Sequence, residues 1–512
     1  MKKRSIRTIY QLIALIAVVF AISSCSDQFY NQQNGELITP DQHYKSATDA
    51  TVSMNGAFVP LQNVIPNLIM IDGLRSDLMD VRPNADLYFK AINDQSFTLD
   101  NPYLDPSDYY KVIINVNEVL ANIDKISKAD KNFDSIMAHS YKGAMIGLRT
   151  WSYFNLVRLY GEAAWIDGNL ATLPAGMKQT ILSKEVMIDT LISQIKPYIY
   201  NNAATKEYVE LRLSPLMNTK ALLGEMYLEK NDYVNATFYL KAACESYGND
   251  VKILKVDKAY AKDGWKTIFN SAESQNTENI SVIPFYSTEK QFNPLPKWMM
   301  SSADYMVKPS QLLVDSFKTQ KPALGKGGDI YRGMAVTFDT TSTGETFISK
   351  YSIDKGQPYS TDIILSRAAD LHLMLAEALN RSGDSKTALI LMNAGWAGES
   401  KKPALWAKWS GNIGIRGRAS LKSKVVPDSV NHVFLTGIAR TEYVEDMIMN
   451  ERALELAFEG KRWNDLVRVA LRRGNPEYLA NKVAAKFSDP SQAAAIKSKL
   501  MVQANWYLPY KK

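Results

Sequence analysis

Three glutamates near the C-terminus have the spacing that paired-carboxylate chemistry would need. Glu451, Glu455 and Glu459 recur every fourth residue, which would place them about 6 Å apart stepwise on one face of a helix. A retaining glycosidase uses two carboxyl groups about 5–5.5 Å apart. Arg452 and Arg462 lie within pairing range, however, and a paired carboxylate stays ionised, whereas a general acid needs a raised pKa. The pattern favours a structural ion network, with a surface glycoside hydrolase as the alternative.

The segment around these glutamates, Glu451–Arg468, is rich in helix-forming residues and contains Gly460. We call it the signature segment and predict that it is one helix, with Leu454 and Phe458 on its packed face. Opposite charges three residues apart predict local ion pairs: Arg452 with Glu455, Glu459 with Arg462, and Asp465 with Arg468. The residues predicted to have this structural role are Glu451, Arg452, Glu455, Glu459, Arg462, Trp463, Asp465 and Arg468.

A second kind of chemistry is binding by aromatic side chains. A sugar ring presents an apolar face to Tyr or Trp, while Asp, Asn and Arg can hydrogen-bond its hydroxyls. Residues 72–103 and 285–305 mix these residue types in loop-like sequence. The residues predicted to bind ligand are Asp77, Arg82, Tyr88, Phe89, Tyr103, Tyr286, Phe292 and Trp298. The alternative is that these aromatics only cover the core.

Signals for cofactors are weak. The four histidines are isolated, no HExxH string occurs, and GKGGD at 325–329 lacks the spacing of a phosphate-binding loop. We predict no cofactor, and leave open a structural calcium site built from loop oxygens. No basic stripe indicates a nucleic-acid partner. Hydrophobic content of 46% and charged content of 22% are typical of a globular protein.

The N-terminus has the features of a bacterial lipoprotein signal. Four basic residues precede an apolar run, Leu12–Ile22, that is too short to span a bilayer. The string Ile22-Ser-Ser-Cys25 then follows, and acylation of Cys25 would supply more than one buried chain. We predict a signal segment at 1–24, a lipidated tether at 25–35 and a single domain at 36–512. Removal of the four positives lowers the formal net charge from +7 to about +3.

Helical periodicity predicts a mainly α fold with large irregular loops and a few short strands. The expected helices are Asp105–Ile126, Asp134–Tyr160, Lys184–Tyr198, Ser214–Lys230, Asp232–Ser246, Ile363–Ser382 and Ser385–Trp396. Leu222–Leu240 aligns without a gap to Met374–Met392, and each predicts a helix, a tight turn and a second helix. Such repeats are typical of tetratricopeptide-like hairpins, here expected near 105–246 and 363–470. Between them, residues 251–361 are expected to form loops and short strands around the ligand.

Four strings, in order, resemble the SusD/RagB family of Bacteroidetes outer-membrane lipoproteins. They are ISSC, GLRTWSYFNLVRLYG, AADLHLMLAEALNRSG and ERALELAFEGKRWNDLVR. The chain ends ANWYLPYKK, which departs from the family's usual C-terminal pattern. The resemblance implies a SusD-like α-α superhelix and no catalysis.

The resemblance also implies a surface-exposed outer-membrane lipoprotein that captures an oligo- or polysaccharide and delivers it to a SusC-like TonB-dependent transporter. Its expected partners are that transporter, the glycan, and the outer membrane through the lipid anchor. RagB-like members serve oligopeptide uptake, so a peptide ligand is an alternative. A purely structural tetratricopeptide scaffold is another.

Overall fold

The protein is described from a computed structural model that covers residues 43–169, 179–199, 217–245, 264–265, 268–269, 278–300, 304–351 and 359–510. The predicted signal segment, the lipidation site Cys25 and the predicted tether lie outside the described residues. Most of the described chain is helical with a few short strands, which confirms the predicted fold class.

The α-helices are α3 (Ala47–Phe58), α4 (Leu61–Arg75), α5 (Leu87–Asn93), α6 (Ser107–Ala129), α7 (Ser135–Tyr160), α8 (Lys184–Ile195), α10 (Thr219–Glu229), α11 (Tyr233–Glu245), α13 (Leu295–Met299), α14 (Gln311–Lys318), α15 (Ala368–Arg381), α16 (Ser385–Met392), α17 (Ile415–Arg418), α18 (Gly437–Glu455), α19 (Arg462–Arg473), α20 (Pro476–Ala484) and α21 (Pro490–Leu500). The 3-10 helices are η1 (Pro102–Leu104), η2 (Lys196–Tyr198), η3 (Ser287–Glu289), η4 (Trp396–Gly398), η5 (Ala404–Trp409) and η6 (Gln503–Trp506).

The strands are β1 (Met79–Val81), β2 (Glu162–Trp165), β3 (Thr180–Ser183), β4 (Asn279–Ile283), β5 (Val307–Pro309), β6 (Phe338–Thr340), β7 (Thr346–Ile348), β8 (Ile363–Arg367), β9 (Ser429–Val430) and β10 (Val433–Phe434). They pair antiparallel, two at a time: β1 with β5, β2 with β3, β4 with β8, β6 with β7 and β9 with β10. Each of these sheets has only two strands and joins two segments of the chain locally. The helices form most of the fold.

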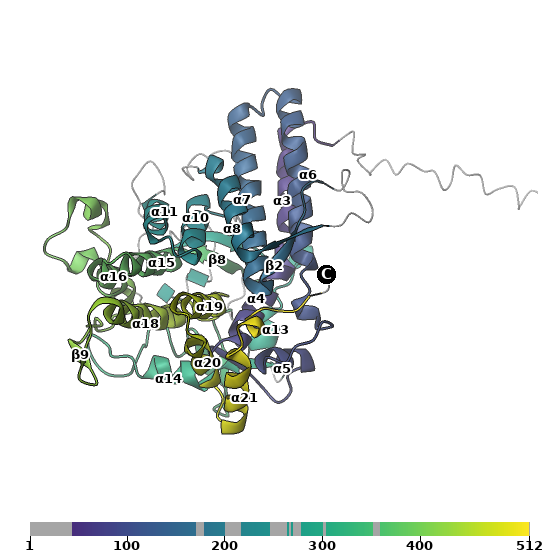
Figure 1. The fold of residues 1–512 in the computed structure, drawn as a ribbon. Coiled ribbons are helices and arrows are strands. Elements are labelled where there is room, and N and C mark those ends of the chain that lie inside the picture. The colour runs from purple at the N-terminus through teal and green to yellow at the C-terminus, as the bar shows by residue number, and fades with distance from the viewer. Residues whose placement is uncertain are drawn as a thin grey trace, which may run out of the picture.

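Helices α3, α6 and α7 stand together as a long layer on one side of the molecule (Figure 1). Helix α7 begins after Asp134, whose carboxylate accepts a hydrogen bond from the backbone N–H of Met137 at 2.8 Å. It ends at Gly161, whose φ of 79° places it in the left-handed region that stops a helix. The boundaries predicted for this helix are confirmed.

The two aligned repeats fold as predicted into helical hairpins, α10–α11 and α15–α16, and α11 packs against α15. Asp232 and Asp384 occupy the same position in the two turns, and each carboxylate accepts a backbone N–H at the start of the second helix. Ala236 and Ala388 also match and are fully buried where the helices approach. The repeat therefore reflects a shared folding unit.

Two predicted helix boundaries near the second repeat are wrong. Residues 363–367 form strand β8, and α15 begins only at Ala368. The run Ile-Ile-Leu is buried and short, and such a run does not distinguish a strand from a buried helix. At the other end, α16 stops at Met392, because Gly395 turns the chain with a φ of 64°.

The signature segment is also not one helix. Helix α18 ends at Glu455 and α19 begins at Arg462, with Phe458 and Gly460 at φ values of 66° and 73° between them. Left-handed residues break the helical hydrogen-bond ladder. Glu459 therefore lies in a turn, and the three glutamates do not share one helical face.

This turn is buried, and the side chains of Lys350, Tyr351 and Arg367 donate hydrogen bonds to its carbonyl groups. Lys350 Nζ donates to the carbonyl of Ala457 at 2.6 Å, and the Tyr351 hydroxyl donates to the carbonyl of Phe458 at 2.6 Å. Arg367 donates to the carbonyl of Glu455. A buried turn without such donors would carry unpaired backbone groups at a large cost.

The ion pairs of the signature segment are mostly long-range, in contrast to the predicted local pattern. Asp465 pairs with Arg468 at 2.8 Å as predicted, but the pairs Arg452–Glu455 and Glu459–Arg462 do not form. Arg452 contacts Asp370 and Asp465, while Arg462 makes two 2.7 Å hydrogen bonds to Asp77. The break in the helix rotates these side chains toward α15 and β1.

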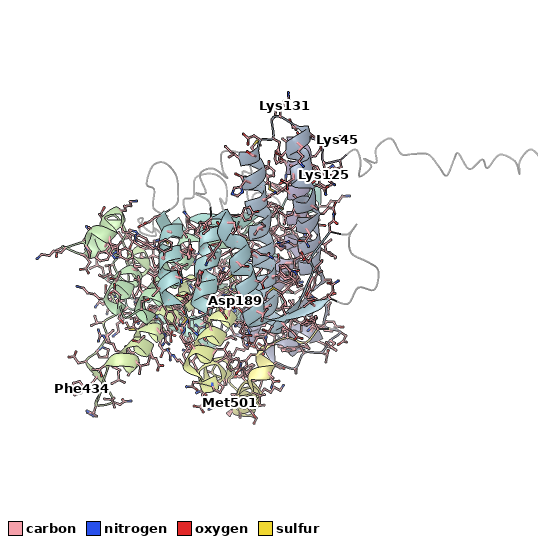
Figure 2. The ribbon with its side chains drawn as sticks, turned by 45° about the horizontal axis from the view of Figure 1, so that its top comes forward. Lys45, Lys125, Lys131, Asp189, Phe434 and Met501 are labelled. Atoms are coloured by element: carbon pink, nitrogen blue, oxygen red, sulfur yellow. The ribbon has the colours of Figure 1, made fainter. Side chains whose placement is uncertain are left out.

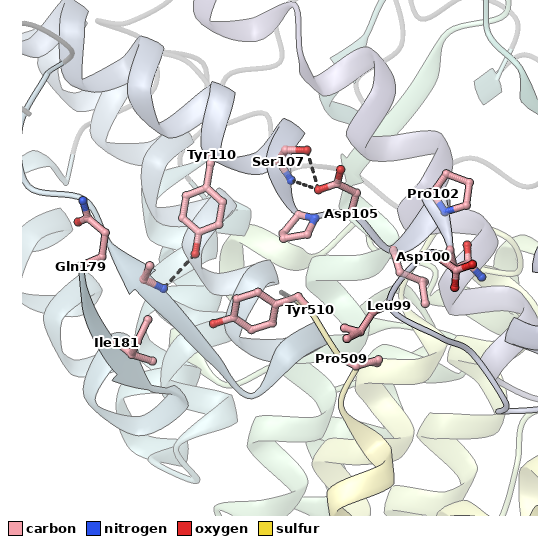
Figure 3. A pocket seen from close by; sticks show the side chains of 14 residues that line it. Leu99, Asp100, Pro102, Asp105, Ser107, Tyr110, Gln179, Ile181, Pro509 and Tyr510 are labelled. Carbon is pink, nitrogen blue, oxygen red and sulfur yellow. Dashed lines mark hydrogen bonds between the residues drawn. The ribbon is translucent and has the colours of Figure 1, made fainter. Parts of the chain in front are cut away.

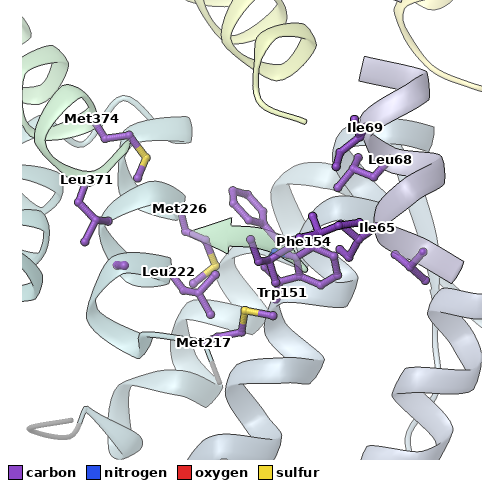
Figure 4. Close-up of a cluster of buried hydrophobic side chains, with 14 of the residues drawn as sticks. Ile65, Leu68, Ile69, Trp151, Phe154, Met217, Leu222, Met226, Leu371 and Met374 are labelled. Atoms are coloured by element: carbon purple, nitrogen blue, oxygen red, sulfur yellow. The ribbon is translucent and has the colours of Figure 1, made fainter. Parts of the chain in front are cut away.

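A large cluster of apolar side chains joins the helical layer to the repeats (Figure 4). Ile65 and Leu68 of α4 meet Trp151 and Phe154 of α7, and Met226 of α10 extends the cluster toward α15. Among the described residues, Ala47–Arg75 has the length and apolar composition of a membrane span, but 78% of that window is buried inside the protein. We interpret it as a core segment.

The described chain begins at the tip of the α6–α7 hairpin. The backbone N–H of Ala47 donates to Asp130 at 2.9 Å, and Lys45, Lys125 and Lys131 lie together at this end (Figure 2). Helices α5 and α13 lie toward the opposite end of the helical layer (Figure 1). Any tether attached before residue 43 would therefore enter far from α5 and α13.

Candidate ligand-binding surface

The glutamates considered for glycosidase chemistry are all held by buried cations. Glu455 contacts Arg332 and Arg367, each at 2.8 Å, and none of these side chains is exposed. Burial opposes ionisation of Glu455, but the two arginines outweigh it and lower its pKa to about 2. Glu451 and Glu459 are paired in the same way. Carboxylates that remain ionised at neutral pH cannot act as general acids, so this cluster has the properties of a structural network.

The aromatic residues predicted from two separate segments come together. Tyr103 stacks on Phe89 with ring centroids 4.3 Å apart, and Trp298 meets both rings edge-on, at 5.8 Å from Tyr103 and 5.4 Å from Phe89. Tyr88 adds an edge-on contact to Tyr103 at 6.5 Å. We call Tyr88, Phe89, Tyr103 and Trp298 the aromatic cluster.

The pairing of β1 with β5 explains why two segments some 200 residues apart meet. Met79 lies opposite Pro309, and the backbone N–H of Arg82 donates to the carbonyl of Met306 at 2.8 Å. Met306 in turn donates to the carbonyl of Trp298 at 2.9 Å. The short sheet thus fixes the start of α5 beside α13.

Asp86 and Asn101 hold the aromatic cluster in place through hydrogen bonds. One oxygen of Asp86 accepts the backbone N–H of Phe89 at 2.7 Å and caps α5, while the other accepts the Tyr103 hydroxyl at 3.1 Å. Asn101 donates to the carbonyl of Tyr88 and accepts from the backbone N–H of Tyr103. Burial and the neighbouring Asp86 raise the pKa of Tyr103, so its hydroxyl stays protonated.

Arg82 lies beside the aromatic cluster, and its guanidinium contacts Tyr305 and Glu345. Its guanidinium stacks over the ring of Tyr305 at 3.9 Å, and Nη2 contacts the exposed Glu345 at 2.6 Å. The side chain is 17% exposed. A guanidinium held in this way keeps a fixed fork of donors at the surface, which suits recognition of hydroxyl groups.

Tyr286 and Phe292 lie in the segment that leads into α13 and are 43% and 54% exposed. Asn293 anchors this segment, because its backbone N–H donates to the carbonyl of Tyr359 and its side chain donates to the carbonyl of Thr361. The two aromatics therefore project from a fixed loop. Both precede Trp298 in the chain, and we place them at the periphery of the aromatic cluster.

Two predicted ligand residues have other roles. Asp77 is buried, and both of its carboxylate oxygens accept hydrogen bonds from Arg462, so the prediction that it contacts ligand is wrong. Phe89 is fully buried and stacks on the ring of Tyr103. A ligand would therefore not stack on Phe89 directly. The ring faces that remain accessible belong to Tyr88, which is 39% exposed, and to the half-buried Tyr103 and Trp298.

Sequence reasoning missed Asp86, Asn101 and Tyr305, which position the predicted residues. Asp86 could have been found as a capping residue three positions before Phe89. Tyr305 had no local signal, because its role depends on the contact with Arg82 across the β1–β5 pair. Within the described part of the chain, no group of three or more His, Cys, Asp or Glu residues is arranged to hold a metal.

The chain matches known proteins at three levels. Residues 339–512 match the model of the SusD family. "SusD-like protein P38" from Formosa agariphila is 23% identical over 496 residues, which cover 89% of this chain and 90% of that protein. A SusD superfamily protein from Bacteroides vulgatus shares the fold with a TM-score of 0.65 and 18% identity, over 89% of this chain and 93% of the other.

A structure described as a laminarin-binding SusD-like protein also shares the fold, with a TM-score of 0.59 and 16% identity. The match covers 88% of this chain and 96% of that one. The family match, the relatives that align over almost the whole length, and the shared helical architecture agree with the order of the four strings found in the sequence. Residues 339–512 thus match the SusD family, and the chain as a whole is similar to SusD-like proteins in sequence and in fold.

Proposed function

We propose that this protein is a non-catalytic, cell-surface glycan-binding protein that captures an oligo- or polysaccharide for a SusC-like TonB-dependent transporter. The observation that carries the proposal is the aromatic cluster, in which Tyr88, Tyr103 and Trp298 present ring faces and edges on one surface. Aromatic rings packed against each other are rigid, so they bind a sugar face without losing much side-chain entropy. A family neighbour that binds laminarin supports a glycan as the ligand class.

The absence of catalysis is part of the proposal. A retaining glycosidase needs one carboxyl group with a raised pKa facing its substrate. Glu451, Glu455 and Glu459 are buried and have lowered pKa values. The signature segment therefore holds α18, α19 and β8 together, and the aromatic cluster binds the ligand.

We also propose that Cys25 is lipidated and attaches the protein to the outer membrane. The signal string and the family assignment support this. The tether would then join the tip of the α6–α7 hairpin, far from the aromatic cluster, so the ligand-binding end could move while the anchor stays fixed. Cys25→Ala should leave the protein folded but shift it from the detergent phase to the aqueous phase. Partitioning like the wild type would contradict lipidation.

A binding screen tests the ligand class. Purified protein is titrated by calorimetry with a panel of neutral, acidic and amino polysaccharides and with a mixed peptide pool. Saturable binding to a glycan, with no reducing ends released on incubation, is the expected result. Binding to peptides alone would replace the glycan proposal with an oligopeptide-binding function. Release of sugar products would restore the hydrolase alternative.

A further inference from the structure

An ion pair beside the aromatic cluster joins two segments that are far apart in the chain. Glu345 Oε2 accepts a hydrogen bond from Arg82 Nη2 at 2.6 Å, and 263 positions separate the two residues. Arg82 lies in the loop between β1 and α5, whereas Glu345 lies in the turn between β6 and β7. Glu345 therefore brings to the binding surface a carboxylate that was not predicted from the sequence.

The guanidinium of Arg82 is held in place by Tyr305. Its central carbon lies 3.9 Å from the centre of the Tyr305 ring, and Nη1 donates to the carbonyl of Tyr305 at 3.0 Å. Tyr305 is buried, and its hydroxyl donates to the carbonyl of Thr346 at 3.1 Å. The backbone N–H of Arg82 donates to the carbonyl of Met306, whose own N–H donates to the carbonyl of Trp298. These contacts tie Arg82 both to the aromatic cluster and to the β6–β7 turn.

The carboxylate of Glu345 is held by the turn that carries it. Thr340 lies opposite Thr346 where β6 and β7 pair, and the carbonyl of Glu345 accepts the backbone N–H of Thr341 at 2.8 Å. The backbone N–H of Glu345 donates to the hydroxyl oxygen of Thr341 at 3.1 Å. Gly344 completes the turn with a φ of 85°. A side chain on such a hydrogen-bonded turn requires little ordering when a ligand binds.

The pair presents a hydrogen-bond donor and an acceptor side by side at the surface. The side chain of Arg82 is 17% exposed, and that of Glu345 is 56% exposed. A guanidinium carries several N–H groups, so the contacts with Tyr305 and Glu345 leave others for a ligand, and Glu345 keeps Oε1 as an acceptor. Adjacent hydroxyls on a sugar ring each donate and accept hydrogen bonds. A neutral sugar can therefore pair one hydroxyl with Arg82 and the next with Glu345.

A sugar that carries a carboxylate would interact less favourably with this pair. Its carboxylate would compete with Glu345 for Arg82, and the two negative groups would repel each other at close range. Lys90 and Asp86, on α5 and at its N-terminus, have opposite signs, and both form hydrogen bonds within the protein. The contact between Glu345 and Arg82 therefore favours a neutral sugar over an acidic one.

We propose that Glu345 sets the charge selectivity of the ligand-binding surface. Together with Arg82 it binds adjacent hydroxyls of a neutral sugar, and it keeps Arg82 from the carboxylate of an acidic sugar. The inference rests on the proposed function, because it assumes that the protein binds a glycan at the aromatic cluster. It adds a further ligand-contacting residue and the charge class of the glycan.

A cavity near the aromatic cluster provides a control for the position of the charge. Its volume is about 1110 Å³, and Pro102 and Leu104 in its wall flank Tyr103 of the cluster (Figure 3). Ile181 of β3 also lines this cavity and is 40% exposed. Ile181→Arg adds one positive charge on β3, so it separates a local effect of Glu345 from a general change in net charge.

The test uses the full-length protein in detergent and calorimetric titration at low and high salt. The neutral probes are laminarihexaose, maltohexaose and cellohexaose, and the acidic probes are the same hexamers with their primary alcohols oxidised to carboxylates. The best neutral polysaccharide of the binding screen is included with its oxidised form. Glu345→Gln removes the negative charge but keeps an oxygen acceptor for Arg82, whereas Glu345→Ala removes both. The controls are Ile181→Arg and Asp124→Asn on α6, where Asp124 is exposed and pairs with Lys142. Each control changes the net charge by the same amount as Glu345→Gln.

We expect the wild type to bind at least one neutral probe about tenfold or more tightly than its oxidised form. Glu345→Gln should tighten binding of the oxidised form about threefold to tenfold at low salt and less at high salt, and should change the Kd of the neutral form less than about threefold. Glu345→Ala should weaken neutral binding about threefold to tenfold. The controls should leave the ratio of the two Kd values within about twofold of the wild type. Because this ratio compares two ligands of one protein, a loss of stability would not imitate the effect.

The results that would overturn the inference differ from those that would overturn the proposed function. If the oxidised probes bind the wild type as tightly as the neutral ones, if Glu345→Gln leaves the ratio unchanged, or if Ile181→Arg changes it equally, Glu345 does not set the selectivity, and the glycan-binding function stands. Unchanged neutral binding in Glu345→Ala would exclude Glu345 from the ligand contacts. If no carbohydrate in this set or in the polysaccharide panel binds, the proposed function itself fails, and the inference fails with it.

Discussion

The ion network around Glu455 and the aromatic cluster around Trp298 are both built from residues distant in sequence, but they differ in what they leave accessible. In the network, Arg332, Arg367 and Glu455 are fully buried, and each charged group faces an opposite charge. In the cluster, Tyr88 is exposed and Trp298 is half-buried. The first arrangement is satisfied within the protein and serves stability, whereas the second retains ring surface that a ligand can cover.

Acid should produce the largest contrast between the two regions. Burial opposes ionisation of Glu229, Glu377 and Glu455, but neighbouring arginines and Lys184 outweigh it and lower each pKa from 4.5 to about 2. Between pH 4.5 and 2 the unfolded chain binds more protons at these sites than the native protein does. Stability should therefore be fully present above pH 4.5 and fall as the pH drops toward 2, by several kcal/mol in total.

Urea unfolding measured between pH 7 and pH 2 checks this prediction. The exposed pair Lys111–Asp108 provides a control, since Lys111→Met should leave the pH dependence unchanged. A free energy of unfolding that stays constant from pH 4.5 to pH 2 would show that the buried pairs do not stabilise the native state.

Removal of one central cation should have the next largest effect. Arg367 contacts Glu278, Glu455 and Glu459, and Arg367→Met would leave these buried carboxylates short of positive charge. We expect a loss of about 3–5 kcal/mol in the free energy of unfolding, measured by chemical denaturation. A loss below about 1 kcal/mol, the range of exposed pairs, would mean that the network contributes little.

Titration of Asp72 should change the stability with pH by a smaller amount than the three glutamates do, and in the opposite direction. Its carboxylate accepts the backbone N–H of Trp463 at 2.7 Å, but burial raises its pKa from 3.8 to about 7. The native protein therefore binds more protons here than the unfolded chain does between these values, so this group's contribution is fully present below pH 3.8 and is lost as the pH rises toward 7.

Asp72→Asn keeps an oxygen acceptor for Trp463 and removes the titration. The variant should lose the decline in stability between pH 4 and pH 7, and should gain about 1–2 kcal/mol relative to the wild type at pH 7. Thermal unfolding at pH 5 and pH 7 is sufficient to measure this. Equal slopes for the two proteins would show that Asp72 does not titrate in this window.

The two regions also differ in how far sequence predicts them. The repeats and α7 follow from local signals, since Asp134, Gly161 and the matched pair Asp232 and Asp384 mark helix ends directly. The ligand-binding aromatic residues were predicted from their residue types in loop-like sequence. No local sequence pattern predicts the pairing of β1 with β5 that brings them together.

In the signature segment, by contrast, a clear local pattern was present but predicted the wrong structure. Its charge spacing predicted a single helix with local pairs, yet Phe458 and Gly460 break the helix and redirect Arg452 and Arg462 to Asp370 and Asp77. A local charge pattern is worth only a few tenths of a kcal/mol per pair. Burial of the turn against Lys350, Tyr351 and Arg367 outweighs such a preference, and tertiary contacts of this kind are not visible in a helical pattern.

The most direct test of the account compares Glu455→Gln with Trp298→Ala in the same two assays, unfolding by denaturant and calorimetric titration with the best glycan of the panel. We predict that Glu455→Gln lowers the free energy of unfolding by about 3 kcal/mol and leaves the Kd within about twofold of the wild type. Trp298→Ala should raise the Kd at least about tenfold, with a smaller loss of stability. Loss of binding in Glu455→Gln at unchanged stability, or unchanged binding in Trp298→Ala, would contradict the division between a structural network and a binding surface.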